Sequence, residues 1–160
     1  MIAAVPLFYV VRSNNVAGWI IRWVTRSKWN HAGIITLDGN RIAAHPGGAG
    51  YEEPSENEHI VYARISVDDH VAIINEAHDL IDAKYGWWDI VSIGLLQWGI
   101  RPGFVRRRVQ NAQPICSQLV DLCISVRWQL FDDGRLPMDV TPGDLVDLGA
   151  LNVGIQRAVQ

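Results

Sequence analysis

The stretch NHAGIITLDGNRIAAH, residues 30–45, decides the fold of this chain because it predicts a complete β-hairpin. Residues 31–37 form a run suited to a strand, and Asp38-Gly39-Asn40 is a strong signal for a tight turn. Residues 41–45 would then return antiparallel to the first strand. The sequence therefore predicts antiparallel sheet structure in this part of the chain.

Further elements extend this hairpin into an α+β fold. Strand patterns cover residues 5–12 and 59–65, and helical periodicity covers residues 16–24, 68–81, 90–98 and a segment that begins near Cys116. Trp19 and Trp23, four residues apart in the first helix, are expected to pack in the core. Residues 51–58 are polar and acidic, and they are interpreted as a surface loop.

Cys116 is the most informative residue for chemistry, and it stands in the motif Pro114-Ile115-Cys116-Ser117-Gln118-Leu119-Val120. A proline, then Cys-Ser and an amphipathic run, predicts a helix that begins at or near the cysteine. A thiol there meets unpaired backbone N–H groups and the positive end of the helix dipole, and both favour the nucleophilic thiolate. His31 could form a thiolate–imidazolium pair with Cys116 if the fold brings them together.

Composition limits the classes of protein that fit. A chain of 160 residues with 49% hydrophobic and 19% charged residues fits one folded domain, and a net charge of −3 argues against general nucleic-acid binding. With two cysteines a disulfide scaffold is not expected, and Cys123 is interpreted as a small core residue. The start of the chain lacks a basic leader region, and no run reaches the roughly 20 apolar residues of a membrane span. A cytoplasmic location is the default expectation, secretion by a route without a signal peptide stays open, and the compact chain is compatible with a phage or a bacterial source.

The order of the motifs resembles the circularly permuted branch of the NlpC-type papain-like superfamily, which also contains the lecithin:retinol acyltransferase-like enzymes. The resemblance rests on Asn30-His31-Ala32-Gly33-Ile34, on Tyr85-Gly86-Trp87, on the cysteine motif and on Thr141-Pro142-Gly143-Asp144-Leu145, and it runs from about residue 5 to residue 146. The histidine precedes the cysteine, as in the permuted group. The resemblance implies a small antiparallel sheet or partial barrel packed against the nucleophile helix. It implies a single domain over residues 1–160, with residues 151–160 as a tail.

In function, the resemblance implies a cysteine hydrolase or acyltransferase that acts on amide or ester bonds. The prediction is a hydrolase that cleaves amide or peptide bonds through a thiol acyl-enzyme, and no cofactor or metal is expected. Cys116 would be the nucleophile, and His31 would be the general base and then the acid that protonates the leaving group. The backbone N–H of Cys116 is the natural donor to the oxyanion. The substrate would be a peptide or an acyl-amide, a class that includes peptidoglycan-derived peptides.

The third catalytic residue departs from the family pattern. Permuted members would place an acidic residue near Ala43 to orient the histidine, and alanine cannot do this. His45 lies two residues further on the same strand face and is the predicted substitute. Asp38 and Asn40 in the turn are the alternatives. Residues flanking the site motifs are the candidates for substrate contact: Tyr85, Trp29, Trp87 and Ser117.

Two other functions fit the same residues. In the first, the chain is a non-catalytic binding or structural module on the same fold, because Ala43 stands where an acidic residue is expected. In the second, it is a metal-binding module in which His31, His45 and Cys116 are three ligands and water is the fourth.

Overall fold

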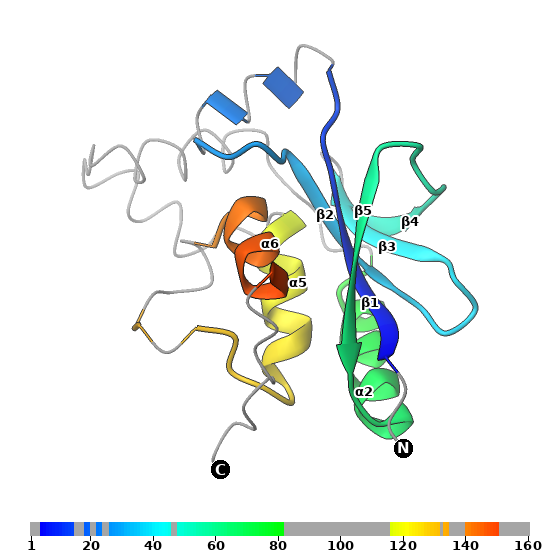
Figure 1. The fold of residues 1–160 in the computed structure, drawn as a ribbon. Coiled ribbons are helices and arrows are strands. Elements are labelled where there is room, and N and C mark those ends of the chain that lie inside the picture. Colours follow the sequence, from blue (N-terminus) through cyan, green and yellow to red (C-terminus); the bar gives the residue numbers. More distant parts are fainter. Residues whose placement is uncertain are drawn as a thin grey trace, which may run out of the picture.

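The computed structural model describes residues 4–14, 18–19, 22–23, 26–45, 48–81, 116–131, 133–134 and 140–150. The fold is α+β, with a five-stranded antiparallel sheet in the order β4-β3-β2-β1-β5 (Figure 1). The strands are β1 (Ala4–Val11), β2 (His31–Ile35), β3 (Arg41–His45), β4 (Gly48–Glu52) and β5 (Glu58–Arg64). The helices are α2 (Val67–Asp79), α5 (Cys116–Ser125) and α6 (Pro142–Ala150). The helix predicted over residues 90–98 lies outside the described residues.

The predicted hairpin is confirmed as β2 and β3, with residues 36–40 as the turn between them. The backbone N–H of Thr36 donates to Asn40 O, and that of Gly39 donates to Thr36 O, both at 3.0 Å. Gly39 has a φ of 85°, which a residue without a Cβ adopts at little cost. The ladder between the strands runs from Ile35↔Arg41 to Gly33↔Ala43. His31 and His45 therefore lie just beyond its end.

The surface loop predicted over residues 51–58 is wrong at both ends, because Tyr51 and Glu52 belong to β4 and Glu58 begins β5. Gly48–Glu52 forms β4, an edge strand that pairs with β3 in the register Ala43↔Gly50 and Arg41↔Glu52. Its sequence, GAGYE, has few apolar side chains because an edge strand has one neighbour and shields little of the core. Backbone pairing with β3 overrides the weak strand propensity of this segment.

The core lies mainly on one side of the sheet. Buried apolar residues of β1, β2 and β3 pack there against α2, α5 and α6 in one cluster that includes Ile34, Ile42, Ile73, Leu119 and Leu145. A smaller cluster on the other side contains Tyr9, Val11, Ile35 and Ala43, with Ile60 packed against it. Cys123 belongs to the main cluster and is fully buried, as predicted. Packing against the sheet thus holds α5 in place.

The helix predicted over residues 68–81 is confirmed as α2. Ser66 caps it, because its Oγ accepts the backbone N–H of Asp69 at 3.1 Å. Ile73, Ile74 and His70 face the core from this helix. At 13 residues it is well under the roughly 20 that a bilayer requires. None of the helices that the structure describes is long and apolar enough to cross a membrane.

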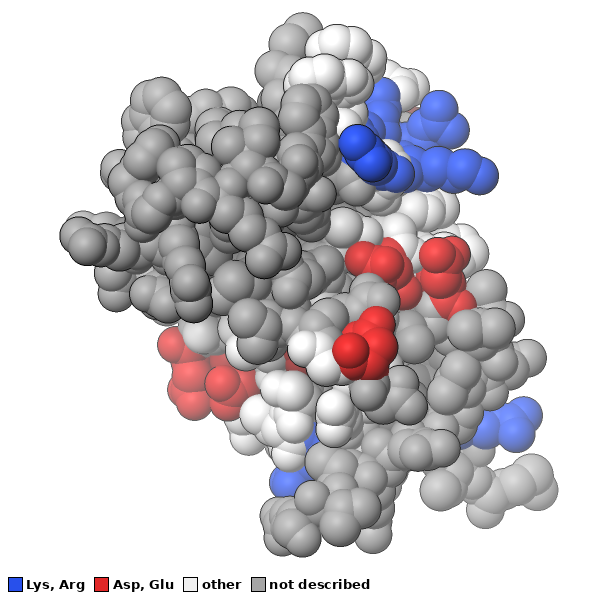
Figure 2. Space-filling view, turned by 90° about the vertical axis from the view of Figure 1, so that its left-hand side faces the viewer, with Lys and Arg blue, Asp and Glu red and all other residues white. Residues whose placement is uncertain are grey.

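The expected core packing of Trp19 and Trp23 is wrong. Their side chains are 59% and 56% exposed, and the two rings stack on each other with centroids 6.5 Å apart and planes 8° apart. Helical spacing of two apolar residues places both on one face of the helix, but it does not say whether that face is covered. On the molecular face in Figure 2, a group of basic side chains lies near the upper edge, acidic side chains lie across the middle, and further basic side chains lie near the lower edge.

Candidate active site

Hydrogen bonds of the preceding residue with the end of β1 and the segment after it fix His31 at the start of β2. Asn30, the preceding residue, is buried, and its backbone N–H donates to Val11 O at the end of β1 at 3.0 Å. Its side chain accepts the backbone N–H of Ser13 and donates to Ser13 Oγ, both at 2.7 Å. The imidazole of His31 therefore extends from a backbone that is held on both sides.

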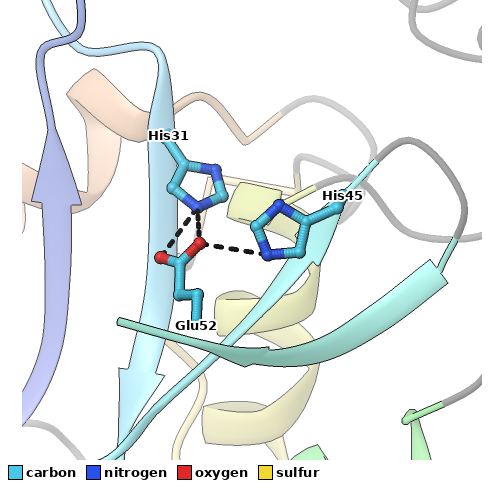
Figure 3. A group of neighbouring side chains, drawn as sticks. All are labelled: His31, His45 and Glu52. Atoms are coloured by element: carbon cyan, nitrogen blue, oxygen red, sulfur yellow. Dashed lines mark hydrogen bonds and ion pairs between the residues drawn. The ribbon is translucent and has the colours of Figure 1, made fainter. Parts of the chain in front are cut away.

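Glu52 lies between His31 and His45, and the three side chains come from the adjacent strands β2, β3 and β4 (Figure 3). Both carboxylate oxygens of Glu52 are 3.0 Å from Nε2 of His31, and Oε2 is also 3.0 Å from Nε2 of His45. The register Arg41↔Glu52 and the period of two along a strand put Glu52 on the face that carries His45. A single carboxylate thus contacts both imidazoles.

The structure corrects the expected orienting residue. The sequence predicts that His45 orients His31, but Nε2 of His45 lies 3.0 Å from Oε2 of Glu52, and the centroids of the two imidazoles are 5.3 Å apart. Glu52 fills the orienting position instead. Sequence reasoning missed it because it assigned residues 51–58 to a loop. The alternation Gly48, Gly50, Glu52 beyond His45 is the signal that could have found it.

Tyr9 holds Glu52 from the other side. Its hydroxyl, on a fully buried side chain of β1, donates to Glu52 Oε1. To reach it the ring crosses β2 at Gly33, where an added Cβ would lie 2.5 Å from the Tyr9 hydroxyl and 2.6 Å from Ile42 O. Gly33 is therefore required by this close approach. The guanidinium of Arg41 lies 5.9 Å from the centre of the Tyr9 ring and keeps it in place.

Cys116 is the first residue of α5, in agreement with the predicted helix start. The helix packs against β2 and β3, and the half-buried thiol interacts with the imidazole of His31 and raises the pKa of that ring. Because Nε2 of His31 faces Glu52, Nδ1 is the ring nitrogen available to Cys116. The fold brings the cysteine and the histidine together although 84 residues, 32–115, lie between them in the chain.

The charges of the site reinforce one another. Burial alone would lower the pKa of His31, but hydrogen bonds with Cys116 and Glu52 outweigh it and raise the pKa from 6.5 to about 10. Burial would raise the pKa of Glu52, but hydrogen bonds from His31 and His45 hold it well below its usual range. Burial and the neighbouring Glu52 raise the pKa of Tyr9, so its hydroxyl stays a donor. At neutral pH His31 is an imidazolium beside a carboxylate.

The Thr-Pro-Gly-Asp-Leu motif forms the start of α6 and contacts the segment before β2. Thr141 and Asp144 cap the helix reciprocally: Asp144 Oδ2 accepts the backbone N–H of Thr141 at 2.8 Å, and Thr141 Oγ1 accepts that of Asp144 at 3.2 Å. Gly143 lets Ser27 approach closely, since a Cβ there would lie 2.8 Å from Ser27 Oγ. The same Oγ accepts the backbone N–H of Trp29 at 3.1 Å, two residues before His31.

The predicted substrate residues differ in where they lie. Trp29 is half-buried, and its ring lies 5.7 Å from that of His59. Ser117 is fully buried and its hydroxyl donates to Val140 O at 2.6 Å. This position ties α5 to the segment before α6 and differs from the expected contact with substrate. Tyr85 and Trp87 lie outside the described residues.

A comparison of the chain with protein-family models and with curated proteins finds no match. The function is therefore argued from the geometry of Cys116, His31 and Glu52.

Proposed function

We propose that this chain is a cysteine hydrolase that cleaves amide or peptide bonds through a thioester acyl-enzyme. The observation that carries the proposal is the position of His31, which interacts with Cys116 and is hydrogen-bonded with Glu52. A nucleophile, a base and a group that orients the base are the parts that thiol catalysis needs. Here Cys116 is the nucleophile, His31 the base and acid, and Glu52 the positioning residue.

The first half of the reaction forms the acyl-enzyme. The Cys116 thiolate attacks the carbonyl carbon of the substrate, and the pair of electrons of the C=O π bond moves to the oxygen. The backbone N–H of Cys116, the first residue of α5, is the proposed donor to that oxyanion. As the C–N bond breaks, His31 gives its proton to the leaving nitrogen and becomes neutral.

The second half restores the enzyme. Neutral His31 removes a proton from a water molecule, which attacks the thioester carbonyl. The C–S bond breaks, the acid product leaves, and the thiolate reforms beside the imidazolium. Glu52 stabilises the imidazolium in both halves and holds the ring so that one nitrogen faces the thiol. Tyr9, which donates to Glu52, keeps that carboxylate in position.

The family resemblance is consistent with this assignment. The permuted NlpC-type pattern includes an acidic partner for the histidine near position 43, and Glu52 supplies one from the neighbouring strand, where Gly50 pairs with Ala43. We therefore place the chain, as a proposal, among permuted papain-like hydrolases, with α5 as the nucleophile helix. The substrate class is a cell-wall peptide or an N-acyl amide. Trp29 lies close to the start of β2, and we propose that its side chain contacts the substrate.

The test is a search for the acyl-enzyme with p-nitrophenyl acetate, a small activated acyl donor. The account predicts a burst of p-nitrophenol of one equivalent per chain and an acetyl group on the peptide that contains Cys116. Cys116→Ala should abolish both. Cys123→Ala is the matched control, because Cys123 is buried in the core and its pKa is raised by that burial.

A screen of peptidoglycan-derived peptides and N-acyl amides with the same variants would then identify the substrate. If acetylation falls on Cys116 and Cys123 at equal rates, or if Cys116→Ala keeps the burst, the hydrolase proposal is wrong. The non-catalytic module, which needs no reactive thiol, would then be the better account.

A further inference from the structure

Two imidazoles and a carboxylate from β2, β3 and β4 converge on one face of the sheet (Figure 3). The ligand-type atoms of His31, His45 and Glu52 all lie within 4.8 Å of one another. Among the residues that the structure describes, this group differs from the one expected from the sequence, which contained Cys116 in place of Glu52. The carboxylate in place of a thiol changes which metal the group favours.

The spacing of these atoms is close to what a tetrahedral metal requires. Oε2 of Glu52 is 3.0 Å from Nε2 of His31 and 3.0 Å from Nε2 of His45. Bonds of about 2.0–2.1 Å in a tetrahedral zinc site place neighbouring ligand atoms about 3.3 Å apart. The two distances to Glu52 would lengthen by a few tenths of an ångström, and the two histidine nitrogens, which lie within 4.8 Å of each other, would settle at the same spacing of about 3.3 Å.

The ligand types and the exposure favour zinc. Two imidazoles with one carboxylate form a known catalytic-type zinc set, and a water completes the fourth position. The side chain of His45 is 40% exposed, so an ion and its water can enter from solvent. The three ligands stand on paired strands of one sheet, and this limits the rearrangement that binding needs.

We propose that His31, His45 and Glu52 form a zinc site whose occupation reversibly blocks the thiol chemistry of Cys116. The zinc site stands on the geometry alone, whereas its inhibitory effect rests on the proposed hydrolase function. Zinc takes the Nε2 lone pair of His31, and the proton on that nitrogen is released to solvent. His31 then loses its hydrogen bond with Glu52, and its other nitrogen, Nδ1, keeps a proton and offers no lone pair, so the ring cannot remove a proton from Cys116 or from the attacking water.

The ligand set is tested by equilibrium dialysis of chelator-stripped protein against Zn²⁺, with metal counted per chain. The wild type should bind one zinc per chain. His45→Ala and Glu52→Gln should each weaken binding by about 100-fold or more, because outer-shell changes alone cost about 10- to 100-fold. His78→Ala is the matched control, since His78 is an exposed histidine hydrogen-bonded to Tyr51 and outside the group. It should bind zinc like the wild type.

Cys116→Ala separates the two proposals. It removes the nucleophile but none of the three ligands, so it should still bind one zinc with wild-type affinity. Loss of zinc in Cys116→Ala would overturn this ligand set in favour of one that contains the thiol. Zinc binding that survives in both Glu52→Gln and His45→Ala would also overturn it. Inhibition is read from the p-nitrophenol burst. Zinc should suppress the burst in the wild type, and a chelator should restore it. A burst unaffected by bound zinc would overturn the inhibitory effect while leaving the zinc site in place.

Discussion

At the scale of single residues, the candidate site is a chain of contacts in which each side chain positions the next. Gly33 makes room for Tyr9, the Tyr9 hydroxyl donates to Glu52, and Glu52 contacts His31. His31 in turn interacts with Cys116. Only the last two members of this series, His31 and Cys116, carry a pattern that sequence reasoning can recognise. The buried tyrosine and the edge-strand glutamate that precede them in the series do not.

Tyr9→Phe should destabilise the protein and leave the fold intact. The variant keeps the ring in the core and removes the donor to a charged, partly buried carboxylate. Hydrogen bonds to charged groups contribute about 1.5–3 kcal/mol, so the free energy of unfolding should fall by about that amount. Urea unfolding measures it. Tyr62→Phe is the control, because Tyr62 is 61% exposed and its change should be within about 0.5 kcal/mol. Equal effects of the two substitutions would contradict the role given to Tyr9.

Gly33→Ala should disturb the same contact by steric means. The new methyl group would lie 2.5 Å from the Tyr9 hydroxyl and 2.6 Å from the carbonyl oxygen of Ile42, so the tyrosine must move away from Glu52. Overpacking of this kind costs about 1–3 kcal/mol, measurable by urea unfolding. Gly50→Ala on β4 is the control, because nothing lies within 4 Å of the position of its Cβ. If Gly33→Ala is as stable as Gly50→Ala, the close approach of Tyr9 does not require a glycine at position 33.

At the scale of elements, the hairpin and the flanking strands could be predicted because apolar runs and Asp-Gly-Asn turn chemistry are local signals. The edge strand β4 could not, because its two described glycines and its glutamate have low strand propensity. Its pairing with β3 depends on a partner that local pattern does not reveal. Glu52 lies on β4, so a sequence analysis that does not detect this strand predicts His45 as the orienting residue in place of Glu52. The exposure of Trp19 and Trp23 could not be predicted for a related reason. Periodicity shows that two residues share one helix face, but it does not show whether another element packs against that face.

The cap of α6 gives a prediction at the scale of one element. Thr141 supplies both an N-cap oxygen and a partner for Asp144, so Thr141→Ala should lower the free energy of unfolding by about 1 kcal/mol. Asp147→Ala, an exposed change in the same helix, should alter it by less than about 0.5 kcal/mol. Urea unfolding of the two variants compares them directly. A larger loss in Asp147→Ala than in Thr141→Ala would refute the capping role.

At the scale of the whole molecule, the sequence predicts the α+β class and the meeting of distant segments, but not how the site is supported. The order of histidine and cysteine motifs implied that β2 and α5 would meet, and they do. The support comes from long-range contacts, such as Asn30 with Ser13 and Gly143 with Ser27, whose partners no local pattern identifies. These contacts join β1, β2 and α6 around His31, so the site depends on the assembled domain.

The stability of the domain should fall as the solution becomes alkaline. The pKa of His31 is about 10 in the folded protein and about 6.5 in the unfolded chain, so the folded state binds the proton more tightly. The resulting stabilisation is fully present below pH 6.5 and is lost as the pH rises through about 10. In chelator-containing buffer, the wild type should lose more free energy of unfolding between pH 7 and pH 10 than His31→Asn does. Parallel losses in the two proteins would rule out this contribution.

The most direct test of the central claim, that Cys116, His31 and Glu52 act as one unit, is a double-mutant cycle on thiol reactivity. The rate of Cys116 alkylation by iodoacetamide is measured at pH 6.5 in the presence of a chelator, with buried Cys123 as the internal control, for the wild type, His31→Ala, Glu52→Gln and the double variant. The account predicts that each single substitution slows alkylation and that the double variant is no slower than His31→Ala, because Glu52 acts only through His31. Independent effects that multiply in the double variant, or a rate in His31→Ala equal to that of the wild type, would contradict it.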